Sequence, residues 1–183
     1  MKINYMFSRI DRDKGFNDNQ KKYIKEDIKN DMSITFIASL FDEYERNTTQ
    51  VKEIVNVFKN IDINFKEVHL IDNRVSKEDA YKYIEKTDIV YLMGGSPELE
   101  MKSIIEYNLF NILRNRNGIT IGTSAGAMNQ TDRVIYKDDF INVGRTYDWC
   151  QRNSILIDHA DLGRFAFVRQ SKIGAFRECK LEG

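Results

Sequence analysis

The chain has 183 residues, and its 28 lysines and arginines balance its 28 aspartates and glutamates. A chain without net charge has no overall field to attract nucleic acid or an anionic membrane surface, so we expect neither partner. It contains no apolar run of membrane-spanning length, no secretory signal and only two cysteines, so we expect a cytoplasmic globular protein without a disulfide framework.

Strands and helices are predicted to alternate along the first two thirds of the chain. The predicted strands cover residues 2–8, 33–40, 64–71, 88–93 and 119–121, and the predicted helices cover 17–30, 48–58, 76–86 and 97–116. Thr48 or Thr49 would cap the second helix, Ser76 the third, and Pro97 fits the first turn of the fourth. This alternation predicts a three-layer α/β fold, with a doubly wound, mostly parallel sheet and helices on both faces.

The pattern is looser after residue 130. Residues 133–136 are predicted to form a short strand, Asp138 and Asp139 a turn, and residues 154–158 a further strand that runs into His159. If this last strand joins the sheet parallel to strand 119–121, their tips lie at the same edge of the sheet. Ligands of such folds bind at the carboxyl ends of the strands.

A G-x-S-x-G motif, Gly122 to Gly126, follows the apolar strand 119–121. This pattern is typical of a sharp strand-to-helix turn that presents a serine, here Ser124, at its apex. The flanking residues must be small because a β-carbon would collide with the strand or the helix. The alternative is a turn in which Ser124 only caps the helix.

A serine hydroxyl needs a base to become a nucleophile, and the chain has two histidines. His69 lies inside a predicted strand and is interpreted as a structural or surface histidine, whereas His159 follows a strand and is the candidate base. An acid should orient the imidazole. Asp138 and Asp139 are the first candidates for this role, and the lesser ones are Asp132, Asp158 and Asp161.

Backbone N–H groups are needed to stabilise the oxyanion of an acyl-transfer reaction. The amide of Ala125, directly after the serine, is one candidate donor. Gly94 and Gly95, which follow strand 88–93, are candidates for the other because glycine allows close approach of the backbone. These turns match neither a P-loop nor a G-x-G-x-x-G, so nucleotide binding is only a third hypothesis.

The segments 91–97 (YLMGGSP) and 121–128 (IGTSAGAM), with Asp158-His159, resemble the dipeptidase E and cyanophycinase family of serine peptidases, peptidase family S51. The resemblance implies a class I glutamine-amidotransferase-like fold and a peptidase of aspartyl peptides that needs neither metal nor cofactor. It implies Ser124 as nucleophile, His159 as base and Asp139 as the acid. It also implies Gly94 or Gly95, with Ala125, as the oxyanion hole.

An aspartyl substrate requires a cation, for which Arg164 is the first candidate and Arg145 the second, since a guanidinium binds a carboxylate with two hydrogen bonds. The sequence departs from the family after His159, where no aromatic residue follows directly, and it ends at Gly183 although the family continues through further strands. Truncation, a shifted reading frame and a divergent terminus each explain this ending.

We therefore expect a single α/β hydrolase-type domain over residues 1–183, short at its C-terminus, with small peptides as substrates. A sheet edge left uncovered by the missing strands would favour a homodimer. The alternative is a catalytically inactive family member that acts as a binding or interaction protein, because a loosely held triad would lose its rate.

Overall fold

The computed structural model describes residues 2–130 with their side chains. Beyond them it describes the backbone of five short strands, at residues 134–136, 139–141, 157–158, 168–170 and 176–178. The elements in chain order are β1 (Lys2–Phe7), α1 (Asp18–Asp27), β2 (Ser33–Ile37), α2 (Tyr44–Lys59), β3 (Glu67–Ile71), α3 (Lys77–Lys86), β4 (Ile89–Leu92), α4 (Pro97–Glu106), α5 (Phe110–Asn115), β5 (Gly118–Thr123), α6 (Ala125–Met128), β6 (Val134–Tyr136), β7 (Asp139–Ile141), β8 (Ile157–Asp158), β9 (Val168–Gln170) and β10 (Phe176–Glu178).

The main sheet has the strand order β10-β9-β1-β5-β4-β2-β3. Its strands β1, β5, β4, β2 and β3 are all parallel, whereas β9 pairs with β1 antiparallel and β10 pairs with β9 antiparallel. The mostly parallel sheet predicted from the sequence is therefore confirmed. The register pairs Phe7 with Thr123 and Leu92 with Gly122, so the carboxyl ends of β1, β4 and β5 lie at one edge.

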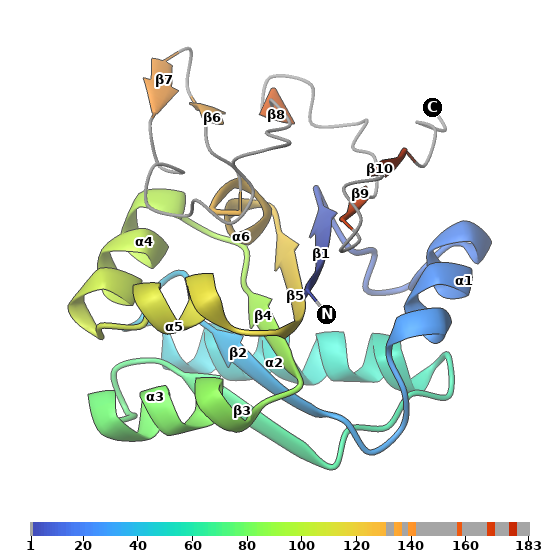
Figure 1. The fold of residues 1–183 in the computed structure, drawn as a ribbon, viewed down its shortest axis with the longest axis horizontal. Coiled ribbons are helices and arrows are strands. Elements are labelled where there is room, and N and C mark those ends of the chain that lie inside the picture. Colours follow the sequence, from blue (N-terminus) through green and yellow to red (C-terminus); the bar gives the residue numbers. More distant parts are fainter. Residues whose placement is uncertain are drawn as a thin grey trace.

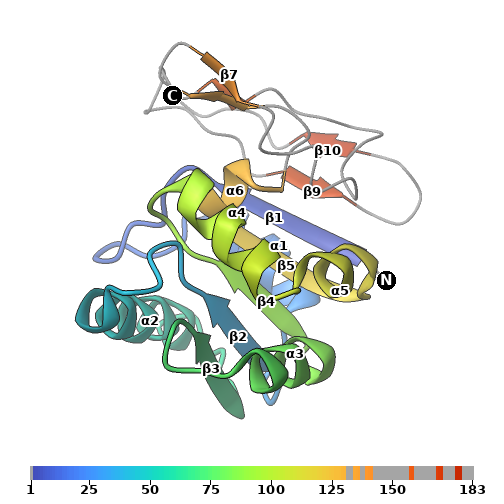
Figure 2. The same cartoon turned by 90° about the vertical axis from the view of Figure 1, so that its left-hand side faces the viewer.

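Helices cover both faces of this sheet, as the two views of the ribbon show (Figures 1 and 2). The chain moves from β1 through β2 to β3 in one direction along the sheet and returns through β4 to β5. Because crossovers between parallel strands are right-handed, this reversal places α1 and α2 on one face and α3, α4 and α5 on the other. The expected three-layer, doubly wound fold is confirmed.

The face of β1 that meets α1 and α2 is built from large side chains at alternate positions. The ring of Phe7 contacts Phe16, and Phe16 in turn contacts Phe58 of α2 at a centroid distance of 5.2 Å. The buried Tyr5 hydroxyl reaches α1, where it donates to the Asp27 carboxylate and lies 3.0 Å from the Tyr23 carbonyl oxygen. These contacts fix the end of β1 next to α2, where the candidate site lies.

Two helix predictions were wrong in their limits. Helix α2 begins at Tyr44 rather than at a cap on Thr48 or Thr49, and the Thr48 hydroxyl instead accepts a hydrogen bond from Arg74. The predicted helix 97–116 is divided into α4 and α5 because Asn108 between them adopts φ 56°, a left-handed conformation that asparagine tolerates without a glycine signal. The cap at Ser76 is confirmed, since its hydroxyl accepts from the Asp79 amide.

The strand before His159 does not join the main sheet. β8 pairs with β6, and β6 pairs with β7, in a separate three-stranded sheet of order β7-β6-β8. The place beside β1 is taken by β9. The condition under which β8 and β5 would end at one edge, a common sheet, is therefore not met. The prediction of a turn at Asp139 was wrong, because this residue begins strand β7. β6 itself was predicted.

Candidate active site

Ser124 occupies the turn between β5 and α6, as the G-x-S-x-G motif predicts. Its backbone adopts φ 53° and ψ −111°, a combination that non-glycine residues rarely adopt. The turn is held on both sides, because the Ser124 amide donates to the Phe7 carbonyl oxygen at 2.8 Å and its carbonyl accepts from Ala127 and Met128. The serine therefore sits on a strained but well-anchored strand-to-helix turn.

The glycines on either side of the serine have no room for a side chain. A β-carbon at Gly122 would lie 2.1 Å from Gln130 Nε2 and 2.3 Å from the Gly126 carbonyl oxygen. A β-carbon at Gly126 would lie 2.2 Å from the Leu92 carbonyl oxygen of β4. The prediction that the residues flanking Ser124 must be small is thus confirmed, because α6 packs closely against the neighbouring strands.

The Gly94-Gly95 turn follows β4 and lies beside the serine turn, since β4 and β5 are neighbours. A β-carbon at Gly94 would be 3.5 Å from the Ser124 β-carbon, so the two turns are in van der Waals contact. The Gly94 carbonyl oxygen accepts two hydrogen bonds, from Ser39 Oγ at 2.8 Å and from Arg46 Nη2 at 3.0 Å. The structure therefore brings together Ser124, Ala125, Gly94 and Gly95.

A pocket of about 710 Å³ opens at this edge of the sheet. Its lining comes from the loop after β1, from α2 between Arg46 and Ile54, and from the ends of β2, β4 and β5. The lining residues include Ser124, both glycines Gly94 and Gly95, and the cations Arg9, Arg12 and Arg46. The volume lies in the range of small-molecule sites, and the position agrees with the rule that parallel sheets bind ligands at the carboxyl ends of their strands.

Tyr91 also lines the pocket, where its hydroxyl and that of Thr123 share a hydrogen bond. Burial raises the pKa of Tyr91 above its ordinary value, and the hydrogen bond with Thr123 only partly opposes this. The phenol is therefore neutral at physiological pH and serves as a fixed wall of the pocket rather than as a base.

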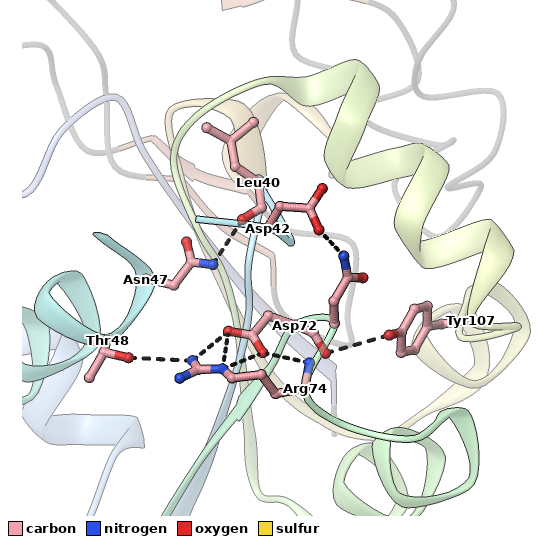
Figure 3. A network of polar contacts seen from close by, with 8 residues as sticks. Leu40, Asp42, Asn47, Thr48, Asp72, Arg74 and Tyr107 are labelled. Carbon is pink, nitrogen blue, oxygen red and sulfur yellow. Dashed lines mark hydrogen bonds and ion pairs between the residues drawn. The ribbon is translucent and has the colours of Figure 1, made fainter. Parts of the chain in front are cut away.

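A network of polar contacts braces the start of α2 against the end of β3 (Figure 3). The buried Asp72 carboxylate accepts from Arg74, with a shortest distance of 2.6 Å, and this hydrogen bond raises the pKa of Arg74. Arg74 also donates to Thr48 and lies over the Tyr44 ring, 4.9 Å from its centroid. In the first turn of α2, Asn47 Nδ2 donates to the Leu40 carbonyl oxygen at 2.8 Å.

The remaining candidates fall on the chain after residue 130. His159, Arg164, Arg145, Asp138, Asp132 and Asp161 lie outside the described residues. Asp139 and Asp158 lie in β7 and β8, so the strand that leads to His159 and the strand of Asp139 flank β6 in one small sheet. His69 lies in the edge strand β3 and stacks on Tyr83 of α3, at a centroid distance of 4.1 Å. This contact agrees with the structural interpretation of His69.

Within the described part of the chain, no group of three or more histidine, cysteine or acidic side chains is arranged to hold a metal ion. None of the described helices combines the length and the apolar character needed to cross a bilayer.

The model of peptidase family S51 matches residues 8–145, more than half of the sequence. The chain belongs to peptidase family S51. Two solved structures have the same fold. One is a proposed peptidase E protein from Listeria monocytogenes EGD-e, with a TM-score of 0.61, 14% identity and full coverage of both chains. The other is a peptidase from an acI-B1 Actinobacterium, with a TM-score of 0.55, 16% identity and coverage of 74% of this chain and 59% of the other. A search of the curated proteins finds no significant match.

The sequence revealed the resemblance of this S51 chain to its family, but it did not reveal that three further residues lie at the site. Ser39 and Arg46 contact the Gly94 carbonyl oxygen, and Arg9 lines the pocket. Arg9 lies two residues after the end of β1, and this position at the carboxyl end of a strand is the sequence signal that could have identified it. Ser39 and Arg46 depend on the order of the strands, which the sequence pattern does not give.

A buried acid ties the serine turn of this S51 protein to α4. Glu100 has no exposed surface, and its carboxylate accepts from Asn129 Nδ2 at 2.6 Å, while the same amide group donates to the Pro97 carbonyl oxygen. Burial raises the pKa of Glu100 well above its ordinary value, more than the hydrogen bond from Asn129 lowers it. The acid is therefore protonated in the folded protein over a range in which the unfolded chain is ionised.

This shift predicts a pH-dependent effect of Glu100→Gln. Below the unfolded pKa of about 4.3, both states carry the proton and Glu100 has no electrostatic penalty. As pH rises above that value, the unfolded state ionises while the folded state does not, so the wild type loses stability that the glutamine variant keeps. We expect the Tm of the variant relative to wild type, measured in thermal melts, to rise as the pH is raised above about 4.5 and to level off where the folded state also ionises. A difference that does not change with pH would contradict the prediction.

Proposed function

We propose that this protein is a serine-type peptidase of the dipeptidase E type, which hydrolyses small aspartyl peptides through an acyl-enzyme on Ser124. The observation that carries the proposal is the position of Ser124, in a strained turn at the edge of a 710 Å³ pocket and next to the Gly94-Gly95 turn. Membership of a peptidase family supports the same reaction class.

In the proposed mechanism, Ser124 Oγ attacks the peptide carbonyl carbon while His159 takes the hydroxyl proton. The negative charge that develops on the carbonyl oxygen is stabilised by the backbone N–H groups of Ala125 and Gly95. The C–N bond then breaks and His159 gives its proton to the leaving amine. Water, deprotonated by the same histidine, hydrolyses the ester, and Asp139 orients the imidazole throughout.

One cation of the pocket, Arg9, supports an acidic substrate. Arg9, Arg12 and Arg46 line the pocket, together with Asp13 and Glu53. Arg12 pairs with Glu53, whereas Arg9 is exposed and forms no ion pair with any of the described residues. Arg9 is therefore a candidate partner of the substrate carboxylate in addition to Arg164.

Arg9→Gln is predicted to weaken the recognition of an acidic side chain. Loss of a hydrogen-bonded charge pair should lower kcat/KM for Asp-Leu about tenfold, mainly through KM, because such a bond contributes about 1.5 kcal/mol or more. The neutral dipeptide Asn-Leu provides the internal control, since its hydrolysis should be unchanged. Equal losses for both dipeptides would show that Arg9 does not read the charge.

The proposal is tested with purified protein and a panel of Asp-X and Ala-X dipeptides. Wild type should hydrolyse the Asp-X members, Ser124→Ala should not, and the matched variant Ser103→Ala, on α4 and outside the pocket, should behave as wild type. Hydrolysis that survives in Ser124→Ala would contradict the role of Ser124. Absence of both hydrolysis and fluorophosphonate labelling in folded wild type would favour an inactive, binding member of the family.

A further inference from the structure

The Gly94-Gly95 peptide is held from one side by two donors. Its carbonyl oxygen, that of Gly94, accepts from Ser39 Oγ at 2.8 Å and from Arg46 Nη2 at 3.0 Å. Ser39 lies two residues beyond the end of β2, and Arg46 lies in the first turn of α2, which follows β2. Both donors therefore approach β4 from the side of β2.

The opposite side of the same peptide carries its N–H group. No cis peptide bond occurs in the described chain, and in a trans peptide the C=O and N–H bonds point in opposite directions. The sheet order is β5-β4-β2, so a carbonyl held toward β2 aims the Gly95 N–H toward β5. Ser124 follows the end of β5 and lies next to Gly94.

A glycine pair does not fix this orientation by itself. Glycine has access to backbone conformations on both sides of φ 0°, so the peptide could rotate and turn its carbonyl oxygen toward the serine. A β-carbon on Gly95 would lie 1.9 Å from Ser39 Oγ, so the hydroxyl reaches the peptide only because this residue is glycine. The site thus combines a peptide that is free to turn with two donors that select one of its orientations.

Arg46 is itself held in place. Its Nη2 donates to the Gly94 carbonyl oxygen. Its Nη1 is shielded from solvent and has no hydrogen-bond partner among the described residues. The first turn of α2 is braced on both flanks of Arg46. On one flank Asn47 donates to the Leu40 carbonyl oxygen (Figure 3), and on the other Arg74 lies over the Tyr44 ring.

We propose that Ser39 and Arg46 are positioning residues, which hold the Gly94-Gly95 peptide so that the Gly95 N–H points at the oxyanion formed at Ser124. The proposal rests on the serine peptidase function proposed above. It assigns Arg46 to the peptide backbone of the site, rather than to the charge of the substrate.

The test uses a neutral alkyl fluorophosphonate, which has no carboxylate for an arginine to bind. Ser124 Oγ forms a bond to phosphorus, fluoride leaves with the electrons of the P–F bond, the hydroxyl proton passes to the base, and the phosphoryl oxygen takes the place of the oxyanion. Removal of a complete oxyanion donor lowers rates about 10²–10³-fold. We expect Ser39→Ala and Arg46→Met each to lower the second-order labelling rate about tenfold, and the double variant about a hundredfold.

Two further variants distinguish positioning from a loss of folded structure. Arg46→Lys keeps a donor within reach of the Gly94 carbonyl oxygen and should recover part of the rate. In a Ser124→Cys background, alkylation of residue 124 by iodoacetamide forms no oxyanion. Adding Ser39→Ala or Arg46→Met should therefore leave the alkylation rate at residue 124 unchanged, when it is resolved from that of Cys150 and Cys179 by peptide mass spectrometry. With Asp-X dipeptides, the positioning variants should lower kcat with little change in KM.

The outcomes separate this inference from the function on which it rests. Wild-type labelling at Ser124 that persists at the same rate in the double variant would overturn the positioning role alone. A parallel fall in fluorophosphonate labelling and cysteine alkylation would also overturn it, since the whole turn would then be disturbed. Folded wild type that is not labelled at all would overturn the proposed function and this inference with it.

Discussion

Replacing Ser124 with glycine is expected to make the protein more stable while abolishing hydrolysis. The backbone of Ser124, at φ 53° and ψ −111°, is strained for a residue with a β-carbon, and such strain costs about 1–3 kcal/mol. Glycine removes the strain but adds about 0.5–1 kcal/mol of backbone entropy to be lost on folding. The net gain of roughly 1 kcal/mol should raise Tm by about 2–4 °C in a chain of this length.

The matched variant is Ser124→Ala, which loses the hydroxyl but keeps the β-carbon and its strain. Both variants should lose about 10⁴-fold or more in kcat, as expected for removal of a serine nucleophile. Only the glycine variant should melt above wild type in differential scanning calorimetry. If both variants melt at the same temperature, the turn is not strained. The protein then loses no stability by holding the Ser124 hydroxyl in this position.

The part of the site that could be predicted is the part in which neighbours in sequence are also neighbours in space. Gly122 and Gly126 are required by contacts with the helix and strand that adjoin the serine, so the motif alone implies the geometry. The Gly94-Gly95 turn could be placed at the same edge because parallel strands share their carboxyl ends.

The residues that sequence reasoning missed are brought to the site by strand order. Ser39 and Arg46 lie 55 and 48 positions from Gly94, and they meet it because β2 and β4 are adjacent in the sheet. Alternating strands and helices predict a parallel sheet without stating which strands are neighbours. For the same reason, β8 could not be assigned to a separate sheet in advance.

The limits of the helices were missed where the local signals are weak. Asn108 ends α4 with a positive φ but without the glycine or proline that marks most such breaks. The start of α2 has no side-chain cap, so Thr48 was the better candidate on sequence alone although its hydroxyl is used by Arg74. The break at Asn108 is closed by local hydrogen bonds, since the Asn108 and Leu109 amides donate to the Ile105 and Ile104 carbonyl oxygens. Only the error at Thr48 arose from a tertiary contact that overrides local preference.

Gly126→Ala should be among the most damaging small changes in this chain. Alanine normally stabilises a helix relative to glycine by about 0.5–1 kcal/mol, so the expected sign is reversed here by contact with β4. The new β-carbon would lie 2.2 Å from the Leu92 carbonyl oxygen and 2.5 Å from its β-carbon, and the first of these is a backbone atom that cannot rotate away. Strand β4 and helix α6 would have to separate in a closely packed layer, with a loss of about 3 kcal/mol.

This loss corresponds to a fall in Tm of about 6–12 °C, measured by thermal melts, and displacement of the serine turn should also reduce fluorophosphonate labelling. Gly94→Ala is the matched control for stability, because its β-carbon would meet the Thr123 carbonyl oxygen at 3.4 Å and Ser124 at 3.5 Å, close to ordinary contact distances. We expect Gly94→Ala to stay within about 1 kcal/mol of wild type, as changes without steric conflict usually do. Equal stability of the two variants would show that α6 does not pack on β4 as closely as the contact at Leu92 requires.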